Sequence, residues 1–227
     1  MVTNNTDNNH IVLVGKITTE KNFSHEIYGE SFYVFSIEIP RLSGSSDILP
    51  ITVSERLLKN ETLVGKKVLV DGQFRSYNGT ESSKSKLILT VFAKDITFLD
   101  ESDEEETNKL PSNDVILNGY ICKPPIYRQT PFGREIADIL LAVNRSYNKS
   151  DYIPCIAWGR NARFCQNLEV GKQVRIMGRV QSRTYEKKFE NGTVETRVAY
   201  EVSISGMEVV NEDNDTGVVE EENKEVV

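Results

Sequence analysis

The segment GKKVLVDG at residues 65–72 returns as GKQVRIMG at residues 171–178, an offset of 106 residues. Upstream of these segments the matches fall 104 residues apart, as in Arg41 with Arg145 and Asp47 with Asp151. The second copy has therefore gained two residues between its two blocks. Because each copy spans about 95 residues, far more than the unit of a stacked repeat array, the pattern indicates a duplicated domain.

Alternating apolar and polar residues predict strands in the second copy. The alternation is regular over residues 174–181 and 197–204, with the period of two that is typical of half-buried strands. Tyr200 belongs to the apolar series and is expected in the core. The apolar residues between Trp158 and Gly171 have helical spacing, and Asn191-Gly192 marks the tip of a hairpin. Further strands are expected over residues 115–121, 135–144 and 152–158.

Both copies follow one order of elements, which is three strands, a short helix and two more strands. In the first copy the strands are expected near residues 10–18, 31–39, 48–54, 67–75 and 85–98, with a helix near 55–61. This order is that of the OB-fold, a five-stranded Greek-key barrel that binds oligonucleotides or oligosaccharides. We therefore expect an all-β protein of tandem OB-fold barrels in residues 1–99 and 113–210, each barrel with one short helix.

The charge is unevenly distributed along the chain. The formal net charge is −7, but residues 100–109 carry −5 and residues 211–227 carry −6. Both segments lack aromatic residues and apolar periodicity, so we expect an acidic linker over 100–112 and a disordered acidic tail over 211–227. Residues 110–210 hold 14 bases against 10 acids, whereas residues 1–99 are neutral. The basic excess therefore lies in the second copy.

The composition argues against several classes of function. No run of about 18 apolar residues occurs, and the first ten residues lack a basic flank and an apolar stretch, so neither a spanning helix nor a secretory signal is expected. Three cysteines without CxxC spacing and two histidines predict no disulfide framework and no metal site. We find no nucleophile beside a base and no Gly-rich phosphate loop, so catalytic residues, cofactors and enzyme activity are not expected.

Residues 113–210 resemble the bacterial single-stranded DNA-binding protein (SSB) family across the whole expected barrel. The resemblance rests on five blocks in order: TPFG from residue 130, LAVNR from 141, DYIPCIAWG from 151, LEVGK from 168 and GRVQSRTY from 178. The first copy resembles the family weakly, mainly through its match to the second. The resemblance implies single-stranded DNA as the partner, a cytoplasmic, nucleoid-associated protein, and a homodimer that presents four OB domains.

The second copy supplies the residue types that single-strand binding needs, namely flat rings for any base and cations for phosphate. Tyr147, Tyr152, Trp158 and Tyr185 fall where the family places its stacking aromatics, and Phe132 lies in the loop before the second strand. Tyr152 and Trp158 share one strand parity, so we expect them on one face. The expected cationic rim consists of Arg134, Arg145, Lys149, Arg160, Arg179, Arg183, Lys187 and Arg197.

The first copy departs from this pattern. At the 104-residue offset, Ser43, Ile48 and Ser54 stand where the second copy has Tyr147, Tyr152 and Trp158. The copy has lost rings and has no basic excess, so a structural or dimerising role is expected for it. Its His25 is expected in an exposed loop.

The expected tail also departs from the family. By the resemblance, such tails end in a Pro-Phe tip that docks replication and repair proteins, but this chain ends in Glu225-Val226-Val227. Recruitment of such partners through the tail is therefore in doubt.

Two functions of different classes fit these observations. The leading hypothesis is sequence-tolerant binding and protection of single-stranded DNA in replication, recombination or repair. The alternative is an OB-fold accessory or regulatory protein of a primosome or recombination system, in which the first domain binds a protein partner. No membrane partner is expected for either function.

Overall fold

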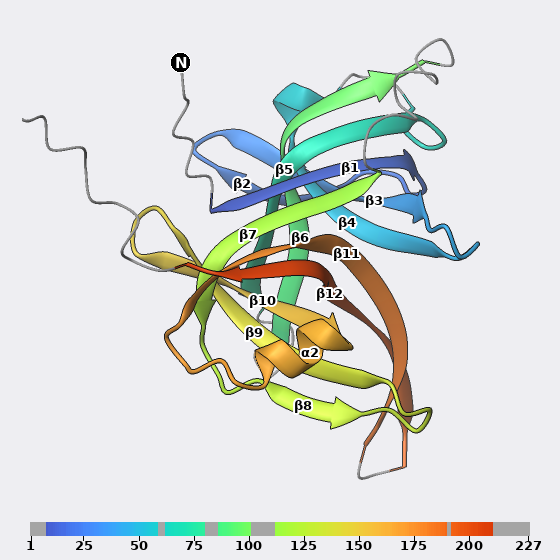
Figure 1. Cartoon of the computed structure of the whole chain (residues 1–227). Coiled ribbons are helices and arrows are strands. Elements are labelled where there is room, and N and C mark those ends of the chain that lie inside the picture. The colour runs from blue at the N-terminus through green and yellow to red at the C-terminus, as the bar shows by residue number, and fades with distance from the viewer. Residues whose placement is uncertain (1–7, 59–61, 80–85, 101–111, 190–191, 211–227) are drawn as a thin grey trace, which may run out of the picture.

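The computed structural model describes residues 8–58, 62–79, 86–100, 112–189 and 192–210. In these ranges twelve strands form one continuous sheet that curls into two barrels (Figure 1). The first barrel contains β1 (Asn9–Ile17), β2 (Asn22–Ile27), β3 (Glu30–Pro40), β4 (Ser46–Ser54), the 3-10 helix η1 (Glu55–Leu57), β5 (Lys67–Gly79) and β6 (Lys86–Leu99). The second contains β7 (Asn113–Ile121), β8 (Ile126–Gln129), β9 (Glu135–Arg145), β10 (Lys149–Trp158), α2 (Arg160–Cys165), β11 (Gln173–Lys188) and β12 (Val194–Val209).

The expected strands and the helix of the second copy are confirmed, with bounds that shift by a few residues. Two strands were not expected, β2 and β8, which each form a short hairpin with the strand that follows. The helix expected near residues 55–61 is wrong in type, because only the 3-10 turn η1 forms there and residues 59–61 lie outside the described residues. Ser54 caps this turn by accepting a hydrogen bond from the Arg56 backbone N–H.

Some expectations concern residues that the structure does not describe. Residues 101–111, most of the expected linker, and residues 211–227, the expected tail, lie outside the described ranges, as does Asn191 at the expected hairpin tip. The division into two domains, a linker and a tail therefore stays a prediction.

Each barrel closes in the same way. The first strand of each barrel pairs with the long strand of the adjacent hairpin, as β1–β3 and β7–β9, and a parallel pairing completes the circuit, as β4–β6 and β10–β12. At the closure a Cβ atom on Gly15 would lie 2.7 Å from the Glu38 carbonyl oxygen, and one on Gly119 would lie 2.5 Å from that of Ala142. Only glycine allows this approach, which explains why the residue recurs at the 104-residue offset.

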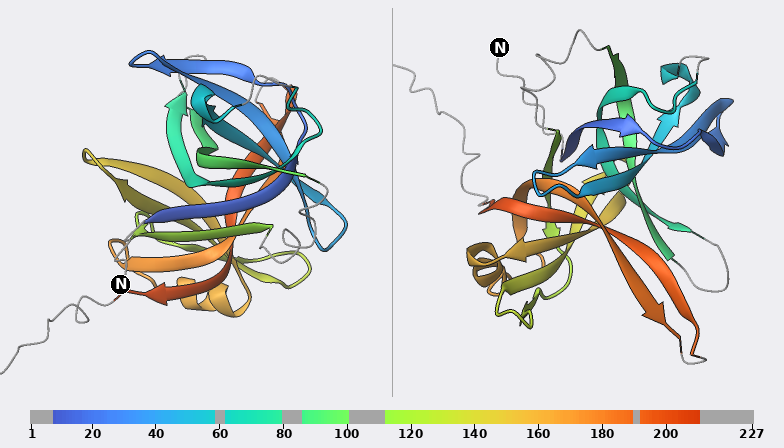
Figure 2. Two further views of the ribbon diagram at one scale, coloured as in Figure 1. Left: turned by 90° about the horizontal axis from the view of Figure 1, so that it is seen from above. Right: turned by 90° about the vertical axis from the view of Figure 1, so that its right-hand side faces the viewer.

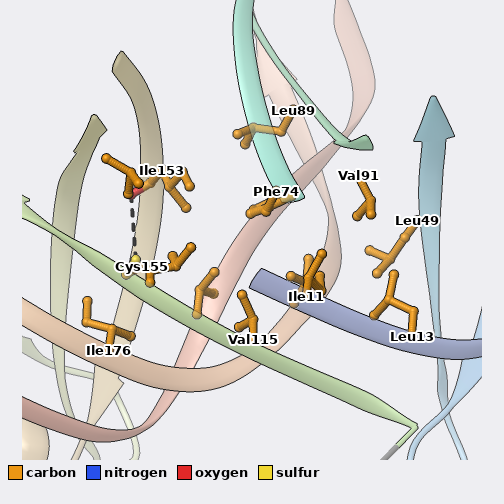
Figure 3. Close-up of a cluster of buried hydrophobic side chains, with 14 of the residues drawn as sticks. Ile11, Leu13, Leu49, Phe74, Leu89, Val91, Val115, Ile153, Cys155 and Ile176 are labelled. Carbon is orange, nitrogen blue, oxygen red and sulfur yellow. Dashed lines mark hydrogen bonds between the residues drawn. The ribbon is translucent and has the colours of Figure 1, made fainter. Parts of the chain in front are cut away.

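The antiparallel pairing of β1 with β7 joins the two barrels (Figure 1). Ile11 lies opposite Val115, and these two residues correspond to each other at the 104-residue offset. The pairing is therefore isologous, with a local twofold axis that passes between them. Both residues point into one apolar core that continues from the first barrel into the second, as Figure 3 shows.

Two buried aspartates reinforce this junction reciprocally. Asp47 on β4 accepts a 2.7 Å hydrogen bond from the Ser182 backbone N–H of the second barrel. Asp151 on β10 accepts a 2.6 Å bond from the Ser76 N–H of the first barrel. Arg41 hydrogen-bonds Asp47, and Arg145 Nε lies 3.1 Å from Asp151 Oδ2. The recurrent Arg–Asp pairs noted in the sequence therefore belong to the contact between the barrels.

Removing one of these carboxylates is expected to weaken the junction. Asp151→Ala leaves the Ser76 N–H without its buried acceptor and Arg145 without its counterion, so the free energy of unfolding should fall by about 1.5–3 kcal/mol. Asp138, half-exposed and paired with Arg128, is the matched control, and Asp138→Ala should cost less than about 1 kcal/mol. Urea denaturation measures both losses, and equal losses would contradict a structural role for the buried carboxylate.

Candidate nucleic-acid interface

Strand β10 places its two large rings on the outside of the second barrel. Ile153 and its alternate neighbours Cys155 and Ala157 point into the core, whereas Tyr152 and Trp158 are 47% and 40% exposed. The shared parity that the sequence indicated therefore puts both rings on one outer face. The backbone N–H of Tyr152 donates a 2.7 Å hydrogen bond to Ser76 Oγ, so a residue of the first barrel helps to position this strand.

The long hairpin of β11 and β12 carries the next ring and projects beyond the rest of the second barrel (Figure 2). Tyr185 is 37% exposed and lies directly opposite Arg197 in the ladder. The guanidinium of Arg183 lies 5.8 Å from the centre of the Tyr185 ring. Phe189, which the sequence reading missed, stands near the tip with Lys187 and Arg197 at 5.4 and 5.6 Å from its ring centre. The hairpin thus alternates rings and cations.

Two further rings lie in turns and are almost fully exposed. Phe132 occupies the turn between β8 and β9, which Gly133 closes with a positive φ of 73°. Tyr147 occupies the turn between β9 and β10 and itself has a φ of 62°, a left-handed conformation that is uncommon for a residue with a side chain. Neither ring packs into the core, so core packing does not explain why these two residues are aromatic.

The expected cations differ in their surroundings. Most of them are exposed, namely Arg134, Lys149, Arg160, Arg179, Arg183 and Lys187. Arg145 is half-buried against Asp151 and Arg197 donates to Glu195 at 2.7 Å, a bond that raises the pKa of Arg197. Burial raises the pKa of Asp151, against the Ser76 N–H and the charges of Arg145 and Arg75.

Two hollows lie where the barrels meet. The hairpin groove, of about 470 Å³, is mostly apolar and lies between the β5–β6 and β11–β12 hairpins. The junction cleft, of about 640 Å³, lies at the turn that carries Tyr147. The hairpin groove is lined by Val34, Pro50, Tyr77, Leu87, Ile88, Leu89, Thr90, Pro154, Tyr185, Arg197, Val198, Ala199, Tyr200 and Glu201. The junction cleft is lined by Asn8, Asn9, Gln73, Arg75, Lys94, Asn144, Arg145, Ser146, Tyr147 and Lys149.

The predicted residues fall into separate parts of this surface. Tyr185 and Arg197 share the hairpin groove, while Arg145, Tyr147 and Lys149 share the junction cleft, and the two hollows have no lining residue in common. Tyr200, expected in the core, is only partly buried and lines the hairpin groove, where burial raises the pKa of its hydroxyl. Phe132 and Arg134 lie together in the β8–β9 turn, and Arg160 and Arg179 line neither hollow.

The outer face of the first barrel has a different set of rings. Ile48 and Ser54 occupy the positions of Tyr152 and Trp158, as expected. The expectation for His25 is wrong, because it lies in β2 and stacks on Phe32, with ring centres 4.9 Å apart. Phe32 also contacts Phe92 of β6, and that ring is covered by Arg75 at 4.1 Å. His25, Phe32 and Phe92 therefore contact one another, whereas Phe23, Tyr28 and Tyr77 of this barrel are exposed.

Two of the three cysteines, Cys155 and Cys165, are buried in the core. Among the described residues, no three His, Cys, Asp or Glu side chains lie close enough to bind a metal ion. Burial raises the pKa of Cys165 to about 11 and raises that of Cys155 as well, so both thiols stay protonated at neutral pH. No helix within the described ranges has the length and apolarity of a membrane span.

Comparison with known proteins gives a family match for the second barrel. The model of the single-strand binding protein family matches residues 112–210. Single-stranded DNA-binding protein B of Bacillus subtilis is 36% identical over 86 residues, which cover 34% of this chain and 74% of that protein. The chain spans about half the length of the first curated relatives that it matches.

Two solved structures extend the comparison. The wild-type single-stranded DNA binding protein from Thermus aquaticus has a TM-score of 0.71 at 18% identity, over 92% of this chain and 96% of that chain, which supports the fold of both barrels. The N-terminal domain of PriB protein from Thermoanaerobacter tencongensis, solved as a dimer, is 52% identical over 42% of this chain and all of that chain, with a TM-score of 0.37.

If the Trp158 ring lies outside the core, its removal should cost little stability. Trp158→Ala is expected to lower the free energy of unfolding by less than about 1.5 kcal/mol, whereas truncation of a buried aromatic costs about 3–5 kcal/mol. Phe74, which is 1% exposed, is the control, and Phe74→Ala should show the larger loss. Chemical denaturation followed by circular dichroism measures both, and a comparable loss for Trp158→Ala would place its ring in the core.

Proposed function

Because the chain belongs to the single-strand binding protein family, we propose that its second barrel binds single-stranded DNA without enzymatic activity. The binding protects exposed strands during replication, recombination or repair, in the cytoplasm at the nucleoid. The observation that carries the proposal is the placement of Tyr152 and Trp158 on one outer face, with Tyr185 on the adjoining hairpin.

The rings supply the part of the affinity that depends on bases. Every base has a flat π-face, and stacking on an aromatic side chain contributes about 1–3 kcal/mol per base. Stacking reads no hydrogen-bonding edge, so it tolerates any sequence. The almost fully exposed Phe132 and Tyr147 extend the set of rings at either end of β9.

The cations supply the part that depends on phosphate. Arg183 and Lys187 lie beside the rings of Tyr185 and Phe189 on the hairpin, so each ring has a positive charge within about 6 Å. A strand that stacks on these rings brings its phosphates near those charges and releases condensed counterions. The exposed Arg134, Arg160 and Arg179 belong to the same proposed rim.

We also propose that two chains pair to present four barrels. Val12, Leu69, Ile116 and Met177 lie half-buried on the outer face of the sheet at the β1–β7 junction, in a strip that also contains His10, Asp71 and Asp114. A second copy of the chain would cover this strip and bring two sets of rings onto one strand at high effective concentration. In this arrangement both barrels contribute to the dimer contact, and the first barrel has mainly this structural role.

The dimer is tested by sedimentation equilibrium. The wild-type chain should sediment as a dimer at micromolar concentration, and Ile116→Lys should shift it toward the monomer because it replaces an apolar side chain of the proposed contact with a longer, charged one. Val170→Lys, at an exposed loop position, is the control and should leave the dimer intact. A wild-type monomer at that concentration would contradict the proposal.

The stacking face is tested by substitutions in both barrels. Trp158→Ala, Tyr152→Ala and Tyr185→Ala should each reduce the binding free energy for poly-dT by about 1–3 kcal/mol, because each removes one stacked base. Ser54→Ala and Ile48→Ala, at the equivalent positions of the first barrel, are matched controls and should leave the affinity unchanged. Fluorescence anisotropy of labelled poly-dT measures the affinity of all five variants.

The salt dependence distinguishes nucleic-acid binding from the binding of ligands that depend on the aromatic rings alone. The logarithm of the association constant should fall with the logarithm of salt concentration, with a slope of about −0.7 for each phosphate neutralised. A slope near zero, or variants of all three rings that bind like the wild type, would contradict a nucleic-acid function.

A further inference from the structure

The junction cleft gathers positive charge from both barrels. Arg145 and Lys149 come from β9 and β10 of the second barrel, whereas Arg75 and Lys94 come from β5 and β6 of the first. Among the described residues that line the cleft, none is acidic. The neutral overall charge of the first copy therefore conceals a local basic surface.

One buried carboxylate lies beside the cleft. Asp151 is fully buried, pairs with Arg145 at 3.1 Å and lies within the field of Arg75. The four cations line a concave surface, and a concave surface concentrates the field of the charges around it. Such a surface attracts anions more strongly than the same charges spread over a convex face.

The two cations of the first barrel are held toward the cleft. The guanidinium of Arg75 packs 4.1 Å from the centre of the Phe92 ring and donates to Gln73 Oε1 at 2.7 Å. Lys94 is the extra residue of a β-bulge, since Gly72 pairs with Ala93 and Asp71 pairs with Asp95. A bulge redirects its side chain out of the ladder, and Lys94 is exposed.

The pairing of the barrels does not by itself produce the positive charge of the cleft. The local twofold axis generates an equivalent surface on the opposite side, where only two of its positions are cationic. Arg145, Tyr147 and Lys149 are replaced there by Arg41, Ser43 and Ser45, while Gln73, Arg75 and Lys94 are replaced by Arg179, Gln181 and Ser205. Duplication alone would have left both surfaces alike, so the charge of the junction cleft is a feature of one side.

We propose that the junction cleft binds phosphate groups of a single-stranded nucleic acid as the strand passes from the second barrel onto the first. This inference rests on the proposed function, and it gives the first barrel a direct part in binding that its missing rings did not suggest. Lys149 lines the cleft and begins β10, the strand that also carries Tyr152 and Trp158, so β10 links the cleft to the outer face of the second barrel. The first barrel contributes charge to this path, and the second contributes both charge and rings.

The test uses the full-length chain, a dT oligomer long enough to cross both barrels, and a titration at several salt concentrations. Arg75→Gln/Lys94→Gln should reduce the magnitude of the log–log salt slope by about 1.4 and weaken binding about 25-fold at about 0.1 M salt, because two phosphate contacts are lost. Lys94→Gln alone should reduce the slope by about 0.7 and weaken binding about 5-fold. Its exposed side chain makes a folding defect in this variant easy to exclude.

The matched control removes two charges from the same barrel at another place. Lys16 and Lys67 lie opposite each other in the β1–β5 ladder, near the C-terminal end of β1. Lys16 is about 23 Å along the strand from Asn9, which lines the cleft, at 3.3 Å per residue. Lys16→Gln/Lys67→Gln should change the slope by less than about 0.3 on the scale of about 0.7 per phosphate.

The outcomes separate this inference from the function on which it rests. If the wild type binds dT and Trp158→Ala weakens it, but the Arg75 and Lys94 variants bind like the wild type, the cleft proposal is wrong and the proposed function stands. Equal losses for the cleft and control pairs would also overturn the cleft. A wild-type chain without affinity for dT would overturn both.

Discussion

The backbone pairing of β1 with β7 is the contact on which the rest of the architecture depends. It places corresponding residues Ile11 and Val115 opposite each other, so several contacts between the barrels occur twice. The reciprocal hydrogen bonds of Asp47 with Ser182 and Asp151 with Ser76 follow from that symmetry. Because both strands have a partner on each side, neither presents an open edge.

On this symmetric frame the two barrels have acquired different surfaces. Substitutions on the outer face of a barrel leave its closure and core intact, so Trp158 and Ser54 can occupy equivalent positions without a change of fold. The same freedom explains the four cations of the junction cleft and the two of its symmetry mate. The residues on the inner face of each strand maintain the barrel, whereas those on the outer face set the binding properties of its surface.

The sequence predicted those features that repeat along one strand. Period-two alternation located β11 and β12, and strand parity placed Tyr152 and Trp158 on one face. The sequence did not predict β2 and β8. These strands have six and four residues that are mostly exposed, so they show no alternation of buried and exposed positions. It assigned the wrong environment to His25, since a ring stacked across strands on Phe32 leaves no trace in local spacing.

The hollows were beyond the reach of a sequence reading for a related reason. The junction cleft joins Arg75 and Lys94 to Arg145 and Lys149, and these pairs lie at least 50 residues apart in the chain. Summing charge over residues 1–99 averaged the local cations with distant acids. The recurrent Arg41–Asp47 and Arg145–Asp151 pairs were visible as repeats, but only the β1–β7 pairing shows that they stabilise the contact between barrels.

Photo-cross-linking can show directly which barrel stacks the bases. The full chain is cross-linked to oligothymidylate that carries 5-bromodeoxyuridine, and the attached residues are mapped by mass spectrometry. We expect the cross-linked rings to be those of the second barrel's outer face, led by Trp158, Tyr152 and Tyr185. Cross-links concentrated on the first barrel, at Phe23 or Phe92 for example, would contradict the assignment of base stacking to the second barrel.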